Sequence, residues 1–278
     1  MRTITISRSY GSAGTLFAKR LSAVLGYQYA DEALINKIDE APEVRNVLAA
    51  HMEDESAPGF LARVAELANN RNFFKVALET CVYDLALKGD LVFVGGGAHI
   101  ILEEYPCLFA VQVVRNLRDR IKAIADEKHI SYDNAFDLVK KRDRHKVNFV
   151  RHYFDRDLFD PTMFHITINA SRVPIDDAVE MVASQAGKTF SFADDQAAEL
   201  FLKKRLIEKK AQLVLFGLDM AHDGRIAFEA QEGGVLIVRG VIGGKDMKER
   251  VLSALSKLPD VSRIEEHLKV EVLSRMLY

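Results

Sequence analysis

The stretch Thr3-Ile-Thr-Ile-Ser-Arg-Ser-Tyr-Gly-Ser-Ala-Gly-Thr15 decides the fold of this chain, because it passes from a strand through a small loop towards a helix. Ile4 and Ile6 alternate with other residues, which is typical of a buried strand. Residues 9–15 form a loop of small residues, and the apolar positions of residues 16–25 then recur at helical spacing up to the stop signal Gly26. A glycine-rich loop between a strand and a helix N-terminus is the geometry in which backbone N–H groups hold a phosphate.

This loop departs from the phosphate-loop pattern G-x-x-x-x-G-K-[ST] at the lysine. Gly14 falls on the lysine position, and Thr15 falls on the position of the hydroxyl that binds Mg²⁺. Arg8 directly precedes the loop and would bring a guanidinium near a bound phosphate. A tight connection without a ligand is the alternative. The first strand-to-helix turn of a parallel sheet is where phosphates bind, which favours a site formed by Arg8, Gly11, Ser12, Ala13, Gly14 and Thr15.

The composition is that of an ordinary soluble protein. The 278 residues are 49% hydrophobic and 28% charged with a formal net charge of −2, which predicts one or two domains and argues against nucleic acid as a partner. Cys81 and Cys107 lie far apart in apolar patterns without metal-ligand spacing, which suits a reducing compartment. The sequence shows neither a signal-peptide pattern nor a transmembrane segment, so we expect a cytoplasmic protein.

Three further apolar strands are expected at residues 91–94, 108–114 and 164–168. They alternate with helical patterns at residues 73–87, 117–127, 131–141 and 175–182. Short apolar strands between helices predict an α/β fold, in which helices cover both faces of a parallel sheet. Polar and glycine residues follow the carboxyl ends of these strands, which is where such sheets bind ligands.

A basic segment at residues 140–151 is the second chemical signal. Its cations, opposed between them only by Asp143, are Lys140, Lys141, Arg142, Arg144, Lys146 and Arg151. Phosphoryl transfer needs cations around the charge on the phosphate oxygens, so the segment predicts a lid with Arg142, Arg144 and Arg151 as catalytic residues. A solvated helix face is the alternative that a run of charges leaves open.

Five stretches resemble the cytidylate-kinase-like family over about residues 1–185: Ile4-Thr-Ile-Ser-Arg-Ser-Tyr-Gly-Ser-Ala-Gly14, Gly26-Tyr-Gln-Tyr-Ala-Asp-Glu-Ala-Leu-Ile35, Val92-Phe-Val-Gly-Gly-Gly-Ala98, His129-Ile-Ser-Tyr-Asp through Asp143, and Ile168-Asn-Ala-Ser-Arg172. The resemblance implies a P-loop nucleoside-monophosphate-kinase domain over residues 1–190, with a nucleotide-binding helical insertion at 31–90 and a mobile lid at 140–157. It implies that residues 11–15 hold the phosphates of ATP, that Thr15 binds Mg²⁺ and that Asp31 lies near the acceptor nucleotide. The implied reaction transfers the γ-phosphoryl group of ATP to a pyrimidine nucleoside monophosphate such as CMP.

Three residues depart from the pattern of that family. Gly14 stands at the lysine position, Ala13 replaces a glycine, and Gly96 stands where the family commonly has an arginine. If the loop needs a positive φ at position 13, alanine adds a steric cost. Two missing cations would weaken the stabilisation of the transition state. A catalytically degenerate nucleotide sensor is therefore the alternative to an active kinase.

A change of composition near residues 187–195 predicts a second, small α+β domain at residues 196–278. Its pattern is helix 198–210, hairpin 225–242, helix 245–258 and strand 262–272, in the order αββαβ. Gly240 and Pro259-Asp-Val261 make this segment resemble a BON domain, which implies a small ligand or a protein partner. A generic α+β accessory domain is the alternative.

Overall fold

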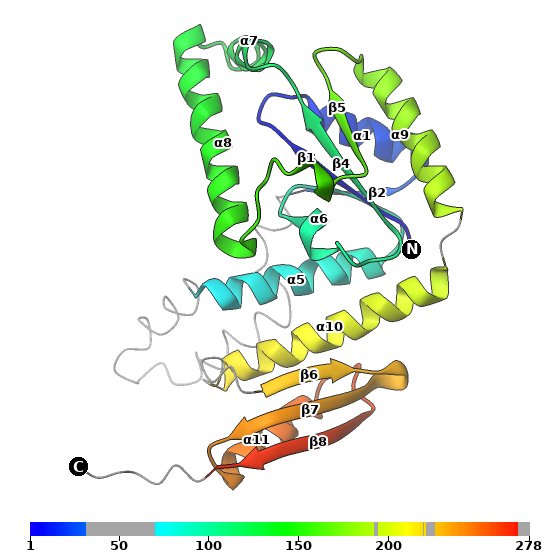
Figure 1. Cartoon of the computed structure of the whole chain (residues 1–278), viewed down its shortest axis with the longest axis vertical. Helices are drawn as coiled ribbons and strands as arrows, with labels where there is room; N and C mark the ends of the chain where they lie inside the picture. The colour runs from blue at the N-terminus through cyan, green and yellow to red at the C-terminus, as the bar shows by residue number, and fades with distance from the viewer. Residues whose placement is uncertain (32–69, 192–193, 219, 221–225, 272–278) are drawn as a thin grey trace, which may run out of the picture. The chain divides into compact units, whose positions relative to one another are not determined.

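The computed structural model describes residues 1–31, 70–191, 194–218, 220 and 226–271 (Figure 1). The chain divides into two compact units, one from Met1–Asn36 and Leu85–Glu199 and the other from Lys37–Asp84 and Leu200–Tyr278. Most of the predicted insertion at residues 31–90 lies outside the described residues. The insertion and the domain boundary between residues 190 and 196 therefore stay predictions.

A five-stranded sheet in the order β2-β3-β1-β4-β5 forms the centre of the first unit. All four strand pairs are parallel, which confirms the predicted α/β fold. The strands are β1 (Thr3–Arg8), β2 (Gln28–Asp31), β3 (Leu91–Val94), β4 (Leu108–Val114) and β5 (Ile166–Asn169). Strand β1 pairs with both β3 and β4, so the loop that follows it starts in the middle of the carboxyl edge of the sheet.

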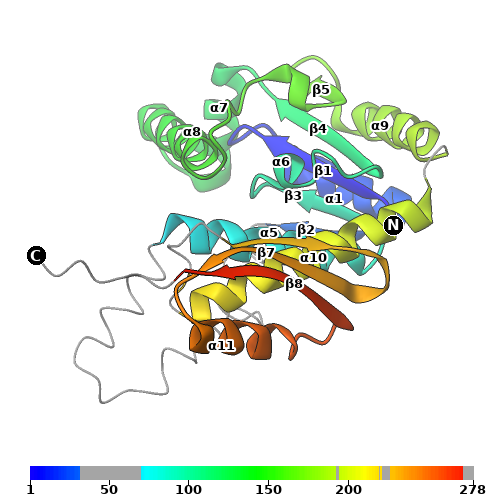
Figure 2. The ribbon, with the colours of Figure 1, turned by 60° about the horizontal axis from the view of Figure 1, so that its bottom comes forward.

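Helices α1 (Gly14–Leu25) and α9 (Ile175–Phe190) lie side by side against this sheet (Figure 1 and Figure 2). Their apolar faces bury Phe17, Leu21 and Val182 in one cluster with strand residues such as Ile4 and Ile6. Burial of each such side chain contributes on the order of 1.5–3 kcal/mol, so this cluster anchors β1 and α1 on either side of the loop.

Helices α7 (Leu117–Lys128) and α8 (Tyr132–Phe154) form a second cluster, which includes Tyr10 of the loop. Ser131 caps α8, because its side chain accepts a hydrogen bond from the Asn134 N–H. The predicted helix ends at Lys141, but α8 continues through the basic segment to Phe154. The expected lid is therefore largely the second half of a long helix.

The first unit also contains two short helices, α6 (Ala98–Ile101) and η2 (Pro161–Met163). Helix α5 (Arg71–Leu87) contributes the residues before Leu85 to the second unit. There Phe73 meets Phe216 of α10 (Asp195–Gly217) edge to face, with ring centroids 5.3 Å apart. Glu79 and Lys209 of the same two helices form an ion pair at 2.7 Å.

The second unit has the predicted order of helices and strands. After α10 come β6 (Ile226–Ala230), the short helix η4 (Glu232–Gly234), β7 (Val235–Ile242), α11 (Lys245–Leu255) and β8 (Arg263–Val270). The sheet order is β6-β7-β8, with β6 antiparallel and β8 parallel to β7. Leu236, Val238, Val251 and Leu255 are buried in its core.

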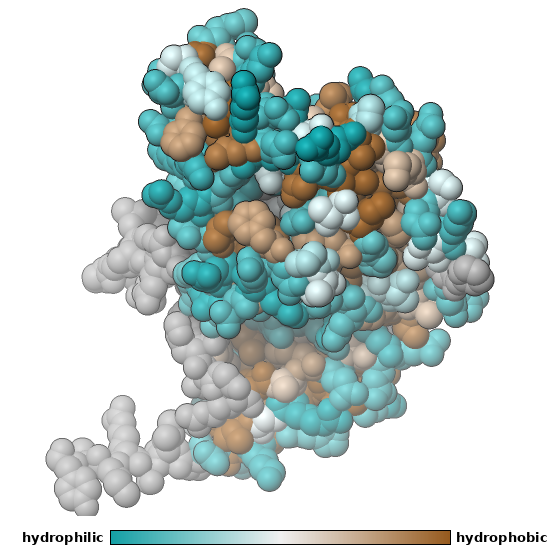
Figure 3. All heavy atoms as spheres, turned by 45° about the horizontal axis from the view of Figure 1, so that its top comes forward, coloured by the Kyte–Doolittle hydropathy of each residue, from teal (hydrophilic) through white to brown (hydrophobic). Residues whose placement is uncertain are grey.

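In the space-filling view, hydrophilic side chains cover most of the visible face, and apolar side chains form smaller patches between them (Figure 3). Within the described ranges, we find no helix with the length and apolar character needed to cross a membrane.

Candidate functional site

The loop between β1 and α1 has a backbone shape suited to anions. Gly11 and Ala13 both have a positive φ, at 78° and 63°, and the Ser12 N–H donates to the Ser9 carbonyl at 3.2 Å. Helix α1 begins at Gly14 with Ala13 as its N-cap, so no side chain caps it, and its first turn contains no acidic residue. The first N–H groups of a helix have no partner within the helix, and they attract negative charge. The loop thus presents donors to a phosphate.

Gly14, at the position of the missing lysine, is buried against Arg8. A Cβ on Gly14 would lie 2.5 Å from the Cβ of Arg8 and 3.0 Å from its Cγ. Real Cβ atoms do not approach this closely, so a lysine cannot fit here while Arg8 keeps its place. The structure thus explains the glycine, because the stem of one cation occupies the space that the other would need.

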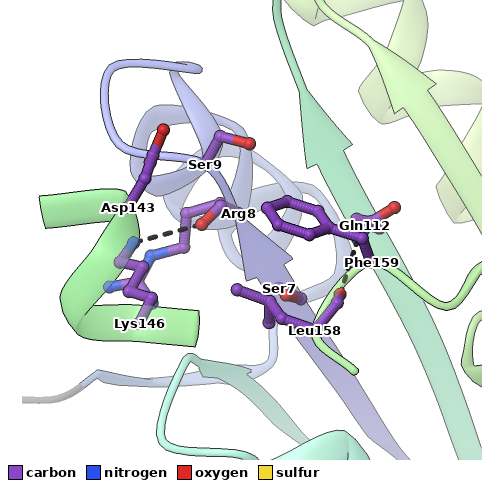
Figure 4. Close-up of a pocket in the computed structure, with 8 residues that line it drawn as sticks. All are labelled: Ser7, Arg8, Ser9, Gln112, Asp143, Lys146, Leu158 and Phe159. Atoms are coloured by element: carbon purple, nitrogen blue, oxygen red, sulfur yellow. Dashed lines mark hydrogen bonds between the residues drawn. The ribbon is translucent and has the colours of Figure 1, made fainter. Parts of the chain in front are cut away.

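A pocket opens beside the start of the loop (Figure 4). Its lining comes from β1 and the loop, β4, α8 and the segment after α8: Ser7, Arg8, Ser9, Gln112, Asp143, Lys146, Leu158 and Phe159. Lys146 donates from Nζ to the carbonyl oxygen of Arg8 at 3.1 Å, which brings α8 against the end of β1. Two cations, Arg8 and Lys146, therefore line the same pocket next to the phosphate loop.

Gln112 fixes the far wall of this pocket. It is buried in β4, its Nε2 donates to the Leu158 carbonyl at 3.2 Å, and its Oε1 accepts from Thr167 at 3.4 Å. The amide thereby holds the segment that carries Phe159, whose side chain lines the pocket and is 54% exposed. An accessible aromatic ring beside the cations offers an apolar surface to a ligand.

Residues of α7 and α8 hold the backbone of Tyr10. Asp143 accepts a hydrogen bond from the Tyr10 N–H at 3.2 Å, and Arg120 donates to the Tyr10 carbonyl at 3.1 Å. Arg120 and Asp143 also form an ion pair at 2.6 Å, with side chains only 11% and 21% exposed. The first peptide groups of the loop are therefore fixed from outside the loop.

The three arginines predicted to be catalytic are exposed on α8 and do not line this pocket. The guanidinium of Arg142 lies over the Tyr10 ring, 6.0 Å from its centroid, so this arginine is near the loop. Arg144 and Arg151 have no such contact among the described residues. Lys146 is the cation of the basic segment that does line the pocket, and it was not among the residues predicted to be catalytic.

The remaining predicted site residues lie at or near the same sheet edge. Ser12 is buried, and its Oγ has no hydrogen-bond partner among the residues described. Thr15 is exposed in the first turn of α1, where its hydroxyl is accessible. Asp31 ends β2, opposite Val94 of β3, and accepts a hydrogen bond from the Tyr29 hydroxyl at 3.2 Å.

The turn after β3 explains why this chain has glycines there. Gly95, Gly96 and Gly97 all have a positive φ, at 84°, 61° and 72°. A Cβ on Gly97 would lie 2.4 Å from the ring of Phe154, so the end of α8 packs directly on the turn. An arginine at position 96 would have to adopt the left-handed conformation in a buried turn, which is unfavourable.

His99 follows this turn and is buried to 5% exposure in α6. Its ring stacks on Phe164 with centroids 4.8 Å apart, and its Nε2 has no partner among the described residues. Burial lowers the pKa of His99 to about 4, because the charged form loses its hydration. The ring is therefore neutral at ordinary pH and adds no cation to the site.

The parallel sheet with a loop of this shape after its first strand defines a P-loop kinase-like α/β protein. A model of the Cytidylate kinase-like family matches residues 3–172. The chain belongs to this family. No curated protein matches it.

Solved structures match this chain at low sequence identity. An uncharacterized protein from Eubacterium ventriosum ATCC 27560 is 19% identical with a TM-score of 0.52, and the match covers 67% of this chain and 99% of that one. Shikimate kinase from Acinetobacter baumannii in complex with shikimate is 14% identical with a TM-score of 0.36, covering 68% and 94%. Shikimate kinase from Bacteroides thetaiotaomicron is 13% identical, also with a TM-score of 0.36, covering 69% and 99%.

Proposed function

We propose that this protein transfers the γ-phosphoryl group of ATP to a pyrimidine nucleoside monophosphate such as CMP. The observation that carries the proposal is the pocket in which Arg8 and Lys146 meet beside the phosphate loop. Phosphoryl transfer is catalysed mainly by positioning and by cations around the phosphate oxygens. Membership of a kinase-like family supports the same class of reaction.

The loop residues Gly11, Ser12, Ala13, Gly14 and Thr15 would hold the phosphates of ATP. Their positive-φ backbone and the uncapped start of α1 would turn N–H groups towards the phosphates, and Arg8 would supply the cation that Gly14 lacks. Lys146 would face the transferred group from α8. Arg142, Arg144 and Arg151 extend this positive surface along the helix, and Asp31 lies at the sheet edge where the acceptor is expected.

Mg²⁺ would be held by the Thr15 hydroxyl and by the phosphate oxygens of the nucleotide. Within the described part of the chain, no group of three His, Cys, Asp or Glu side chains gathers that could hold a metal. This fits a cation that arrives with its nucleotide, since Mg²⁺ in such sites needs only one or two protein ligands. When bound, it neutralises phosphate charge.

A nucleotide sensor is the second candidate function. Gly14 excludes the usual lysine, and Ala13 keeps a φ of 63° that costs about 1–2 kcal/mol for a residue with a Cβ. Both features suit a loop that binds a nucleotide without rapid turnover. In that case the BON-like segment at residues 196–278 would bind a small ligand or a protein partner. Nucleotide binding at the loop would then change the affinity of that segment for its ligand or partner.

A coupled kinase assay with ATP and Mg²⁺ tests the proposal across CMP, dCMP, UMP and AMP, beside a calorimetric titration of ATP. We expect turnover with a pyrimidine monophosphate and loss of ATP binding in Gly11→Val. The matched control is Lys122→Met, which removes an exposed cation of α7. ATP binding without turnover of any acceptor would favour the sensor, and absence of ATP binding would exclude both functions.

A further inference from the structure

The start of the phosphate loop is held by side chains from outside it, in addition to the backbone hydrogen bonds from the Ser12 N–H to the Ser9 carbonyl and from the Ser9 N–H to the Val113 carbonyl of β4. Lys146 donates to the Arg8 carbonyl, Asp143 accepts from the Tyr10 N–H, and Arg120 donates to the Tyr10 carbonyl. Asp143 and Lys146 lie one turn apart on α8, so one helix face offers an acceptor and a donor to the backbone of residues 8–10. The conformation of this backbone therefore depends on side chains of α7 and α8.

Packing adds to these hydrogen bonds. The Tyr10 side chain contacts the cluster formed by Ile121, Ile124, Ala135 and Val139. At the next residue, a Cβ on Gly11 would lie 3.0 Å from Ile124 and 3.1 Å from the Arg120 carbonyl oxygen. The loop thus lies in close contact with α7 where its φ turns positive, and it has no room to relax on that side.

We propose that Arg120 and Asp143 are positioning residues whose ion pair keeps the loop in its phosphate-binding conformation. The inference rests on the proposed function, because it assumes that residues 11–15 hold the phosphates of a nucleotide. The pair does not need to touch the nucleotide. It fixes the Tyr10 peptide groups, and the N–H groups that follow then stay directed to a single point.

Because the two residues of the pair have opposite charges, the proposal predicts a different change in phosphate affinity for the loss of each one. Asp143 brings a carboxylate to the edge of an anion site, where alone it would repel a phosphate. Arg120 neutralises that charge at 2.6 Å, so the repulsion is small while the pair is intact. Loss of Asp143 should therefore weaken phosphate binding through loop disorder, and loss of Arg120 should weaken it further because an uncompensated carboxylate remains.

The experiment compares Asp143→Asn, Arg120→Gln and the double variant with the parent protein. ATP affinity is measured by calorimetry, and amide exchange of residues 9–15 is measured by NMR without nucleotide. We expect ATP to bind Asp143→Asn about tenfold more weakly and Arg120→Gln more weakly still, since hydrogen bonds to charged groups are the stronger ones. The double variant should bind ATP more tightly than Arg120→Gln alone, and the Tyr10 amide should exchange faster in all three.

Asp137→Asn on α8 and Arg118→Gln on α7 are the matched controls, because both side chains are exposed. If Asp143→Asn does not fold, Arg120→Lys takes its place, because lysine keeps the charge but lacks the fork that reaches both Tyr10 and Arg115. Unchanged or tighter ATP binding in Asp143→Asn, or unchanged exchange of the Tyr10 amide, would overturn the inference. If the parent binds no ATP, the proposed function fails, and amide exchange alone then decides the positioning role.

Discussion

Arg8 and Gly14 lie so close together that the stem of the arginine fills the space of a side chain at position 14: a Cβ added to Gly14 would lie 2.5 Å from the Cβ of Arg8. The two residues are therefore not independent features of the loop. A chain that places an arginine at the end of β1 in this conformation needs glycine at the start of α1.

The contact predicts a strong coupling between the two positions. Gly14→Ala should lower the free energy of unfolding by about 1–3 kcal/mol, because the added methyl group has no room. In an Arg8→Gly background the same change should cost much less, since the opposing carbons are gone. Urea unfolding of both single variants and the double variant measures the coupling.

Gly187→Ala is the control for this cycle. Gly187 lies within α9, and a Cβ there would have no atom within 4 Å. This substitution should raise stability by about 0.5–1 kcal/mol, as expected in a helix. Equal effects of Gly14→Ala in the two backgrounds would show that Arg8 does not occupy the space.

Ala13→Gly should stabilise the protein, although glycine in place of alanine weakens the interior of a helix. The φ of 63° at Ala13 is unfavourable for a residue with a Cβ, and the relief exceeds the extra chain entropy of glycine. We expect a gain of up to about 1 kcal/mol in thermal unfolding. Ala123→Gly, inside α7, should instead lose about 1 kcal/mol. If both substitutions lower the stability, the backbone at Ala13 is not strained.

Lys146→Met should lower turnover more than any other single change on α8. Removal of one preorganised charge from a transition state costs on the order of 10²–10³-fold in kcat. Alanine at Arg142, Arg144 or Arg151 should lower turnover less and leave the melting temperature almost unchanged, because these side chains are exposed. Lys141→Met is the matched control. Full activity of Lys146→Met would show that Lys146 does not take part in phosphoryl transfer.

Stability should fall below neutral pH because of His99. Its pKa is lowered to about 4 in the folded protein and is near 6.5 when unfolded, so between these values only the unfolded chain binds the proton. Above about pH 6.5 the proton equilibrium of His99 does not lower the free energy of unfolding. Between pH 6.5 and pH 4 it lowers the free energy of unfolding by about 3 kcal/mol. The free energy of unfolding, measured between pH 7.5 and 5, tests this effect. In His99→Phe the free energy of unfolding should depend less on pH. If the free energy of unfolding of the variant has the same pH dependence as that of the parent, His99 does not cause the loss of stability.

The strand and helix order could be predicted because buried parallel strands carry continuous apolar runs, as in Leu91–Val94 and Leu108–Val114. Strand β2 was missed because Gln28–Asp31 is short, lies at the sheet edge and buries only Ala30. Its sequence therefore lacks an apolar signal. The C-terminal sheet was predicted because Glu232-Gly233-Gly234 separates two alternating runs.

The loop after β1 and the place of Arg8 beside it could be predicted from the sequence, but the approach of Lys146 could not. Six cations follow one another in the basic segment, and only the rotation of the helix decides which of them faces the loop. The sequence predicts a helix that ends at Lys141, where the run of charged residues begins. Once α8 continues to Phe154, Asp143 and Lys146 share a face directed to residues 8–10.

The division of the chain has a consequence for its synthesis. The second unit takes α5 from before β3 and α10 from after β5. Phe73 therefore leaves the ribosome long before Phe216, its partner in the edge-to-face contact, has been made. Domains usually fold as they emerge, but this unit cannot be completed until most of the chain is translated. A gene cut near residue 196 would leave Phe73 without Phe216 and Glu79 without Lys209.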